Sequence, residues 1–354
     1  MGKYIIRRLL LTILVVVCAA FIIFTVMYFV PGDPAVMILG GDASPKDLAN
    51  MSATLGLDQP YMVQLWKFMS DAFLHLDLGT SWFRGVTVMS GLLDRLPRTF
   101  LLGVLSVAFM VVIGVPIGIN AAIHRGGVMD RVLITVSMLF ISLPEFCLAL
   151  LLILVFSLEL GWLPSYGIET WTCYILPVVA GSLGGVCNIA RQTRASVLDV
   201  INADYITTAR AKGMKERAVI YKHMLPNALI PIITLAGNYF TRCVGGTIVI
   251  EKIFSFPGIG LYLTDAISSR DYPIIRGGVI VLAAFTAILM LLVDLAYAYV
   301  DPRIKAQYAD SGKKKGRIEG QHGHHHHRGG GHNDHGNMRR HGDGQRRVHA
   351  GEKE

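Results

Sequence analysis

The segment ADYITTARAKGMKERAVIYKHMLPNALIP, residues 203–231, is a basic and mostly polar stretch in a chain that is otherwise strongly apolar. Of the 354 residues, 53% are hydrophobic and only 16% are charged, and the mean hydropathy is +0.49. Soluble domains carry about 25% charged residues. The composition therefore predicts an integral membrane protein, in which this segment stands outside the bilayer.

Six apolar runs are long enough to cross a hydrocarbon core of roughly 30 Å at about 1.5 Å per helical residue. They are Leu9–Val30, Thr99–Ile123, Val132–Leu158, Tyr174–Ile189, Ala228–Ile250 and Gly277–Val300. The first run could be a secretory signal because basic residues precede it. It is too long for a signal core, however, and no small-residue cleavage site follows it. We therefore expect an all-α integral membrane protein with six transmembrane helices.

The basic residues predict the orientation of these spans. Lysine and arginine gather before the first run, in residues 124–131 and 191–222, and from Arg303 onward, whereas the other loops carry few of them or balance them with acids. Basic loops remain in the cytoplasm, so we expect a multi-pass protein of the plasma (inner) membrane with both termini cytoplasmic. The five cysteines lie mostly in apolar runs, and their odd number gives no sign of a disulfide framework.

Composition divides the chain into four parts. Residues 1–30 hold the N-terminus and transmembrane helix 1, and residues 31–98 are expected to form an external, periplasmic-side subdomain with a helix over Tyr61–Phe73. Residues 99–305 hold the remaining five spans and the polar loop 191–227. Residues 306–354 contain almost no large apolar side chain, which predicts a disordered cytoplasmic tail rich in histidine.

The polar loop has the pattern of two short helices. Apolar residues share one helical face before its middle: Val197, Leu198, Ile201, Tyr205 and Ala209. This face predicts an amphipathic helix that lies on the membrane surface or docks into a partner. Gly213 suits the left-handed position just past its end, and a second helix, Lys215–Met224, is expected to stop before Pro226. On these residues alone, a solvated basic loop remains an equal alternative.

A resemblance favours the docking interpretation. Thr207-Thr208-Ala209, Gly213 and His223-Met224-Leu225-Pro226 have the spacing of the E-A-A-x-x-x-G…I-x-L-P loop, so the segment resembles the permease subunits of binding-protein-dependent ABC importers. Threonine stands where glutamate is usual, and His223 where isoleucine is. In that family the loop forms a coupling helix held in a groove of the ATPase subunit. The resemblance implies these coupling residues: Asp204, Tyr205, Thr208, Ala209, Arg210, Ala211, Lys212 and Gly213.

Further blocks look like the dipeptide, oligopeptide and nickel branch of these permeases, and they follow one another over about residues 1–305. They are PGDP at 31–34, LGLDQP at 55–60, DLGTS at 77–81, LPRT at 96–99, ARAKG at 209–213, EKIF at 251–254, FPGIG at 256–260, DYP at 271–273 and DPR at 301–303. The family implies six spans per subunit and four kinds of neighbour: a second homologous permease, two cytoplasmic ATPases, an extracytoplasmic substrate-binding protein and membrane lipid, with no nucleic acid.

The chain is not expected to be an enzyme. It contains no G-x-x-x-x-G-K-[ST] phosphate loop, so no cofactor is expected on it, and ATP and Mg belong to the partner ATPases. The resemblance implies translocation of dipeptides or oligopeptides. A nickel or nickel-chelate importer of the same family is the near alternative, and a secondary transporter or channel without ATPase is the distant one.

Two charges fall inside the apolar runs. Glu145 lies in the third run and Arg242 in the fifth, where an unpaired charge costs about 2.5–3.5 kcal/mol on insertion scales. Both lie roughly 20 Å from the inner surface at about 1.5 Å per residue. Pro144, Gly245 and Gly246 would loosen these helices. One hypothesis is that Glu145, Arg242, Gly245 and Gly246 line a translocation path, and the alternative is a buried ion pair that only fixes helix packing.

Nine of the twelve histidines follow Gly320. Imidazole binds Ni, Zn, Cu and Co, and a flexible cluster can supply several ligands. The candidate ligands for Ni or Zn in this tail are His322, His324, His325, His326, His327, His332 and His335. Three interpretations remain open: a metal-buffering tail linked to nickel transport, incidental metal binding, and an extension without a role.

Overall fold

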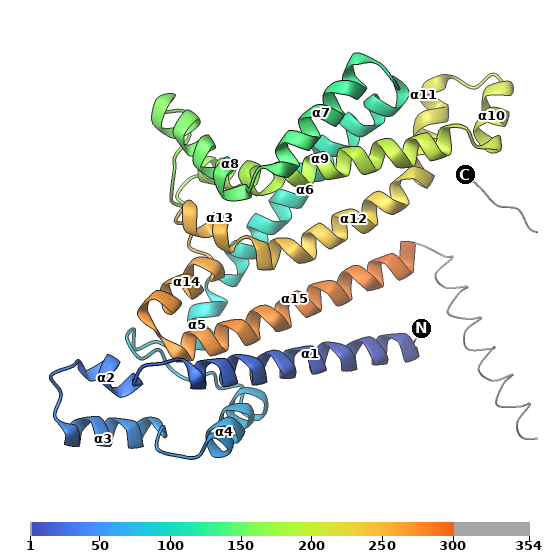
Figure 1. Cartoon of the computed structure of the whole chain (residues 1–354). Helices are drawn as coiled ribbons and strands as arrows, with labels where there is room; N and C mark the ends of the chain where they lie inside the picture. Colours follow the sequence, from blue (N-terminus) through green and yellow to red (C-terminus); the bar gives the residue numbers. More distant parts are fainter. Residues whose placement is uncertain (1, 301–354) are drawn as a thin grey trace, which may run out of the picture. The chain divides into compact units, whose positions relative to one another are not determined.

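The computed structural model describes the backbone of residues 2–300, and the side chains of these except 2–5, 230, 243, 244, 246 and 297–300. Helices make up nearly all of its regular structure, and no strand longer than the isolated bridge Thr80–Thr87 occurs among residues 2–300. The elements shown in Figure 1 are α1 (Gly2–Phe29), α2 (Pro34–Leu39), α3 (Pro45–Leu55), α4 (Tyr61–Leu74), α5 (Val88–Leu93), α6 (Leu96–Ile123), α7 (Val128–Ser142), α8 (Glu145–Leu152), η1 (Ile153–Glu159), η2 (Trp171–Tyr174), α9 (Ile175–Ile201), α10 (Asp204–Ala211), α11 (Glu216–Ala218), η3 (Val219–Met224), α12 (Leu225–Gly246), α13 (Ile248–Ile253), α14 (Ile259–Ser269) and α15 (Tyr272–Val300).

The number of spans depends on how two bent helix pairs are counted. Four helical stretches are long and apolar enough to cross a membrane: Ile6–Phe29, Val88–Ile123, Trp171–Ile201 and Tyr272–Ala296. Two further pairs pass the same test only when joined across a bend, which gives up to six spans by length and composition. The all-helical membrane protein is confirmed, whereas the number of six spans stays a prediction.

The third expected run is not one straight helix. Helix α7 ends at Ser142, Leu143 is extended at ψ 128°, and α8 begins after Pro144. Proline lacks the N–H that would continue the ladder, and it disfavours helix at the preceding residue. The two halves are bent by 100°. The continuous span expected over Val132–Leu158 is therefore wrong, and Glu145 begins a new helix.

The limits of the next two runs also differ from expectation. Helix α9 continues to Ile201, twelve residues beyond the expected end at Ile189, so the start of the polar loop is helical and continuous with the span. The expected amphipathic helix is broken at Asn202 and Ala203 before α10 begins. Downstream, η3 runs directly into α12 through Pro226, so the predicted stop before that proline is wrong. The π-helical turn of η3 supplies the widened ladder in which a proline is tolerated.

Close approach of α6 and α9 forms the centre of the bundle. A Cβ on Gly118 would lie 2.4 Å from the carbonyl oxygen of Ala190, and one on Gly114 would lie 2.9 Å from that of Val186. Because glycine alone fits at such distances, these two residues allow the backbones to touch, as small residues do between membrane helices. Helices α7, α12 and α13 also contact α9, while α15 contacts α12 and α1 (Figure 1).

The region between the first two long helices contains four short helices. The helix expected over Tyr61–Phe73 is confirmed as α4, and its Tyr61 hydroxyl shares a 2.7 Å hydrogen bond with Thr25 of α1. Helix α3 is capped by the Ser44 side chain and ends at Gly56 in the left-handed region. Helix α4 therefore packs against α1, while α2 contacts α3 and α5 contacts α15.

The chain divides after Pro302 into two units, and the second, from Arg303, lies outside the described residues. The predicted tail and its histidine ligands fall in that unit.

Candidate functional site

Helix α10 presents most of the predicted coupling residues to solvent. Seven of the eight are exposed: Asp204, Tyr205, Thr208, Arg210, Ala211, Lys212 and Gly213. The eighth, Ala209, is buried at 6% exposure, and Ile206 beside it is fully buried. The apolar face of α10 therefore consists of Ile206 and Ala209, whereas Tyr205, expected on that face, is 45% exposed. The break at residues 202–203 rotates the helix and accounts for this difference.

A tight turn joins α10 to the next helix. Gly213 has φ +74°, as predicted, and the N–H of Met214 reaches the carbonyl of Ala209 at 3.4 Å, which is the pattern of a glycine-terminated helix. Arg210 and Glu216 form a bidentate ion pair across this turn, with one N–O distance of 2.6 Å. The turn and the ion pair join α10 to α11, and Met214 of the turn packs against buried apolar residues.

An apolar cluster attaches this segment to the bundle. Its buried members come from five elements: Ile119, Ala122, Val197, Ile206, Ala209, Val219, Ile220, Met224 and Ala228. Because α6, α9 and α12 all contribute, a displacement of α10 would be transmitted to three long helices. A buried ion pair between Asp130 of α7 and Arg194 of α9 lies in the neighbouring part of the bundle.

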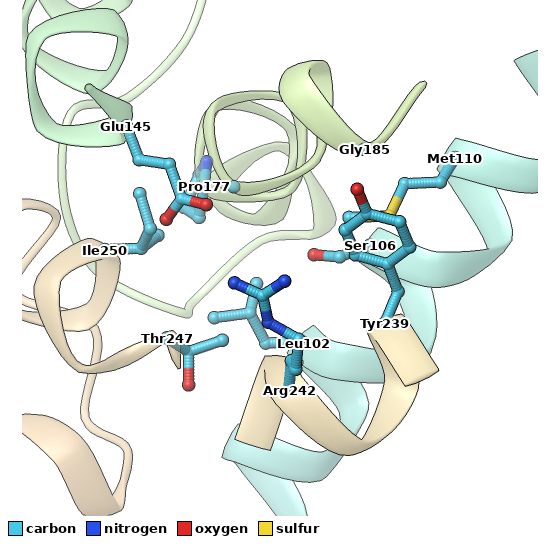
Figure 2. A pocket seen from close by; sticks show the side chains of 11 residues that line it. Leu102, Ser106, Met110, Glu145, Pro177, Gly185, Tyr239, Arg242, Thr247 and Ile250 are labelled. Atoms are coloured by element: carbon cyan, nitrogen blue, oxygen red, sulfur yellow. The ribbon is translucent and has the colours of Figure 1, made fainter. Parts of the chain in front are cut away.

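A cavity of about 90 Å³ lies where α6, α8, α9, α12 and α13 meet. Its polar wall is made by Glu145 at the start of α8, Arg242 near the end of α12, and Ser106, Tyr239 and Thr247. Figure 2 shows the Glu145 carboxylate and the Arg242 guanidinium pointing into the same space from different helices. The cavity thus has opposite charges on two of its walls.

The structure brings Glu145 and Arg242 to one cavity without a direct contact. Among the residues that the structure describes, no ion pair within 4.0 Å joins them, so the alternative of a closed ion pair is not formed. Arg242 also lines a second cavity of about 400 Å³ with Asp294, and Asp294 pairs with Arg8 of α1. Arg242 therefore lies between two cavities whose other walls carry carboxylates.

The two predicted glycines lie at the end of α12, and Gly245 does not line the cavity. Gly246 is the last residue of α12, and a Cβ on Gly245 would meet open space. The glycines that face the cavity are Gly181 and Gly185 of α9, and a Cβ on Gly185 would lie 2.4 Å from the sulfur of Met110.

Three polar residues that line the cavity were not predicted from the sequence: Ser106, Tyr239 and Thr247. A signal for them existed, because Leu102, Ser106 and Met110 recur at a spacing of four in α6. Tyr239 and Arg242 likewise stand three residues apart on α12. Polar side chains at helical spacing within apolar runs therefore marked two of the cavity walls.

A buried carboxylate organises the segment beyond the cavity. Glu251 is fully buried and accepts hydrogen bonds from the Thr99 hydroxyl at 2.8 Å, the Thr247 hydroxyl at 3.3 Å and the Leu261 N–H at 3.1 Å, with the Gly260 N–H contributing as well. The Ile259 N–H donates to the Thr99 hydroxyl at 2.9 Å. The first N–H groups of α14, which have no partner within the helix, are thereby satisfied.

Blocks far apart in the sequence meet in this region. LPRT at 96–99 reaches two blocks. Thr99 donates to Glu251 of EKIF, and Arg98 donates to the Pro257 carbonyl of FPGIG at 3.3 Å. DLGTS at 77–81 reaches DYP at 271–273, because the carboxylate of Asp271 accepts from Ser81 and from the Trp82 N–H. No pattern in the sequence pairs these blocks, because each contact spans more than 150 residues.

No group of three or more histidine, cysteine, aspartate or glutamate side chains that could hold a metal occurs in the described part of the chain. The predicted ligands His322, His324, His325, His326, His327, His332 and His335 lie outside it, so metal binding by the tail stays a prediction.

Two family models match the chain. Residues 114–306 match the binding-protein-dependent transport system inner membrane component, and residues 1–103 match the N-terminal part of the same kind of membrane component. Together they cover both the polar loop and the region between the first two long helices.

Relatives match over nearly their whole length. The chain is 41% identical over 305 residues to the glutathione transport system permease protein GsiC of Pectobacterium atrosepticum, covering 86% of this chain and 99% of that protein. It is 39% identical, with the same coverage, to the protein of that name in Escherichia coli K12. Among solved structures, the inward-facing MetNI methionine ABC transporter aligns with a TM-score of 0.49 and 20% identity over 60% of this chain and 97% of that chain.

Proposed function

Because this chain belongs to the family of inner-membrane permease subunits of binding-protein-dependent ABC importers, we propose that it forms half of a translocation pore for short peptides. The energy comes from separate ATPase subunits, since the sequence holds no phosphate loop. The relatives named for glutathione transport support the peptide over nickel, because glutathione is itself a short peptide with a free amine and free carboxylates.

The observation that carries the proposal is the cavity with Glu145 and Arg242 on its walls. A peptide with free termini has one positive and one negative end, and two opposite charges that face one space can each attract one end without a covalent step. Their separation matters, because a closed ion pair would leave neither charge for a passing substrate. On the wall formed by α9, Gly181 and Gly185 add no side chain beside that of Pro177.

Coupling to the ATPase is assigned to α10 and the turn at Gly213. Its exposed Tyr205, Thr208 and Lys212 offer aromatic, hydroxyl and cationic groups to a partner, and its buried side chains connect it to α6, α9 and α12. ATP-driven closure of the partner subunits would move α10, and the bundle would alternate between inward- and outward-facing states.

The assembly implied by the family has a second permease, two cytoplasmic ATPases and an external binding protein. The segment 31–98 is assigned to docking of the binding protein, and both termini to the cytoplasm. The His-rich tail is proposed as a site for Ni or Zn on the exit side, where it can retain or sense metal but cannot select a substrate outside. A nickel importer remains the second candidate because of this tail.

The test is uptake by the assembled transporter in a strain that lacks the chromosomal copy, with a labelled dipeptide and labelled nickel as alternative substrates. Dipeptide uptake is expected, and Glu145→Gln or Arg242→Gln should each lower it by about tenfold or more while the subunits still copurify. Lys252→Gln is the matched control, because Lys252 pairs with Asp265 on the exposed side. Nickel uptake without dipeptide uptake, or full dipeptide uptake in both variants, would contradict the proposal.

A further inference from the structure

A third cavity with charged walls lies far from α10, beside α2, α3 and α4. It has a volume of about 420 Å³ and is enclosed by the end of α1, the turn that follows it, the turn between α3 and α4, and the start of α15 (Figure 1). Small-molecule sites typically measure about 300–1,000 Å³. It shares no lining residue with the cavity that holds Glu145 and Arg242.

The walls of this cavity are fixed by hydrogen bonds. The Gln64 amide donates to the carbonyls of Leu57 and Gln59, at 3.2 and 2.8 Å, and so holds the turn between α3 and α4. The Asp33 side chain accepts from the Ala35 N–H at 2.9 Å and caps α2. These contacts place Asp33 and Asp58 on the wall without depending on a ligand.

Arg276 is the unusual member of the lining. Its guanidinium carbon lies 4.8 Å from the ring centroid of Phe24 and 5.8 Å from those of Phe68 and Tyr272. The aromatic rings lie over the guanidinium, and the N–H groups along the edge of the guanidinium remain available for hydrogen bonds. Within residues 2–300 it makes no ion pair with a carboxylate, and its buried Nε has no hydrogen-bond partner.

A half-buried guanidinium whose buried Nε has no acceptor is costly, and a planar carboxylate is the acceptor that matches its two parallel N–H groups. The remaining charges of the lining, Asp33 and Asp58, are both negative. They would repel a ligand that is only anionic and would attract one that also carries an ammonium group. Tyr28, Tyr272 and Leu57 add an apolar surface between the two kinds of charge.

From this arrangement we infer that the cavity is a binding site for a short peptide with free termini, in which Arg276 receives the carboxylate and Asp58, with Asp33, receives the ammonium. The site is separate from the pore and would hold the peptide before it enters. The ligand class rests on the proposed function, but binding to this cavity needs neither ATP nor a partner subunit.

The test measures binding by calorimetry on the purified full-length chain in lipid nanodiscs. The probes are the dipeptide alanyl-phenylalanine, its C-terminal amide and its N-acetyl derivative. The free dipeptide should bind, and each blocked form should bind at least about tenfold more weakly, since each loses one charge-assisted contact. Because the comparison is made within one protein, it does not depend on whether a variant folds.

Variants assign the contacts. Arg276→Gln should weaken the free dipeptide by at least about tenfold and remove the difference between the acid and its amide, as expected for two partners of one contact. Asp58 is exposed. Asp58→Asn should likewise weaken binding of the free dipeptide, and it should remove the difference in affinity between the free dipeptide and its N-acetyl derivative. Lys67→Gln is the control of matched charge, since Lys67 is an exposed cation of α4 that does not line the cavity.

Three results would overturn the inference. The C-terminal amide could bind as well as the free dipeptide, or the free dipeptide could fail to bind at millimolar concentration. Binding could also be lost in Arg242→Gln but not in Arg276→Gln, which would place the peptide in the pore. Loss of affinity for the external binding protein alone in Arg276→Gln would make the cavity a docking surface instead. None of these binding results decides whether the assembled transporter takes up dipeptide, so the inference and the proposed function can fail independently.

Discussion

The segment around α10 and the segment around Glu251 both connect long helices, but they are stabilised in opposite ways. Around α10, apolar side chains are buried and the polar groups, including the Arg210–Glu216 pair, are exposed. Around Glu251, a carboxylate and the hydroxyls of Thr99 and Thr247 are buried, with each donor paired. An exposed polar surface is free to bind another protein, whereas a buried polar network fixes one backbone arrangement.

The largest effect is expected from Glu251→Ala. Removing the carboxylate leaves the Thr99 and Thr247 hydroxyls and the Leu261 N–H without their acceptor, at about 1–3 kcal/mol for each buried group. We expect a loss of about 3 kcal/mol or more, seen as little folded protein and a strong fall in melting temperature in detergent. Glu251→Gln keeps the volume and one acceptor oxygen, so its loss should be smaller. A wild-type melting temperature in the alanine variant would contradict the network.

The same carboxylate predicts a pH dependence. Burial raises the pKa of Glu251 above its ordinary value of 4.5, although the hydrogen bonds from Thr99 and the Leu261 N–H oppose the shift. The folded state then holds a proton that the unfolded chain releases. The contribution of Glu251 to the free energy of unfolding is therefore full below about pH 4.5 and is lost as the pH rises through the folded pKa. The melting temperature should fall over that window in the wild type and stay flatter in Glu251→Gln.

Two single substitutions on α10, one at a buried and one at an exposed residue, test whether its apolar side chains fix the helix while its polar surface binds a partner. Ala209→Trp places a large ring in a filled apolar cluster and should cost about 1–3 kcal/mol or prevent folding. Tyr205→Ala removes an exposed ring and should change stability by about 0.5 kcal/mol or less, while capture of the ATPase subunits falls. Equal losses of stability in the two variants would show that Tyr205 belongs to the core.

A smaller effect is expected at the turn. Gly213→Ala should cost about 1–2 kcal/mol, because an L-residue is disfavoured at φ +74°, and not because of crowding, since a Cβ there meets open space. Asn tolerates this conformation better than Ala, so Gly213→Asn should lose less. Melting curves of the three proteins give the order, and an alanine variant as stable as the wild type would argue against this backbone conformation.

The smallest effect is expected from the ion pair across the turn. Arg210 and Glu216 are exposed at 38% and 56%, and such surface pairs contribute at most about 1 kcal/mol and are screened by salt. Arg210→Gln should lower the melting temperature slightly at low salt, with no difference from the wild type at high salt. A large effect that persists in high salt would show that the pair is not a surface interaction.

The sequence predicted the parts of the fold that depend on neighbouring residues. Four of the apolar runs, the helix from Tyr61 and the left-handed Gly213 follow from local composition and turn chemistry, and all of these are present. Pro144 was expected only to loosen the third helix, because the hydropathy of the run is continuous, but the structure breaks the helix there. Hydropathy measures the transfer of side chains into lipid and does not account for the backbone N–H that proline lacks.

The contacts that depend on distant residues were not predictable. Nothing near Glu251 in the sequence indicates that Thr99 will meet it, and the apolar surroundings of Arg276 come from α1 and α4. Glu145 and Arg242 were singled out as charges in apolar runs, and this reasoning found two of the cavity's polar residues. It missed Ser106, Tyr239 and Thr247, since uncharged polar groups cost little in a membrane helix and stand out less.

Helix α9 has a mechanical consequence. It is a single helix of 27 residues, about 40 Å long at 1.5 Å per residue, with Pro177 and Gly181 beside the charged cavity near its start and α10 just beyond its end. A stiff rod of that length acts as a lever: a swing of about 5° about one end carries the other through about 3–4 Å. That displacement exceeds the width of a water molecule, so a small rotation of α9 about one end moves the residues at its other end by more than one solvent diameter.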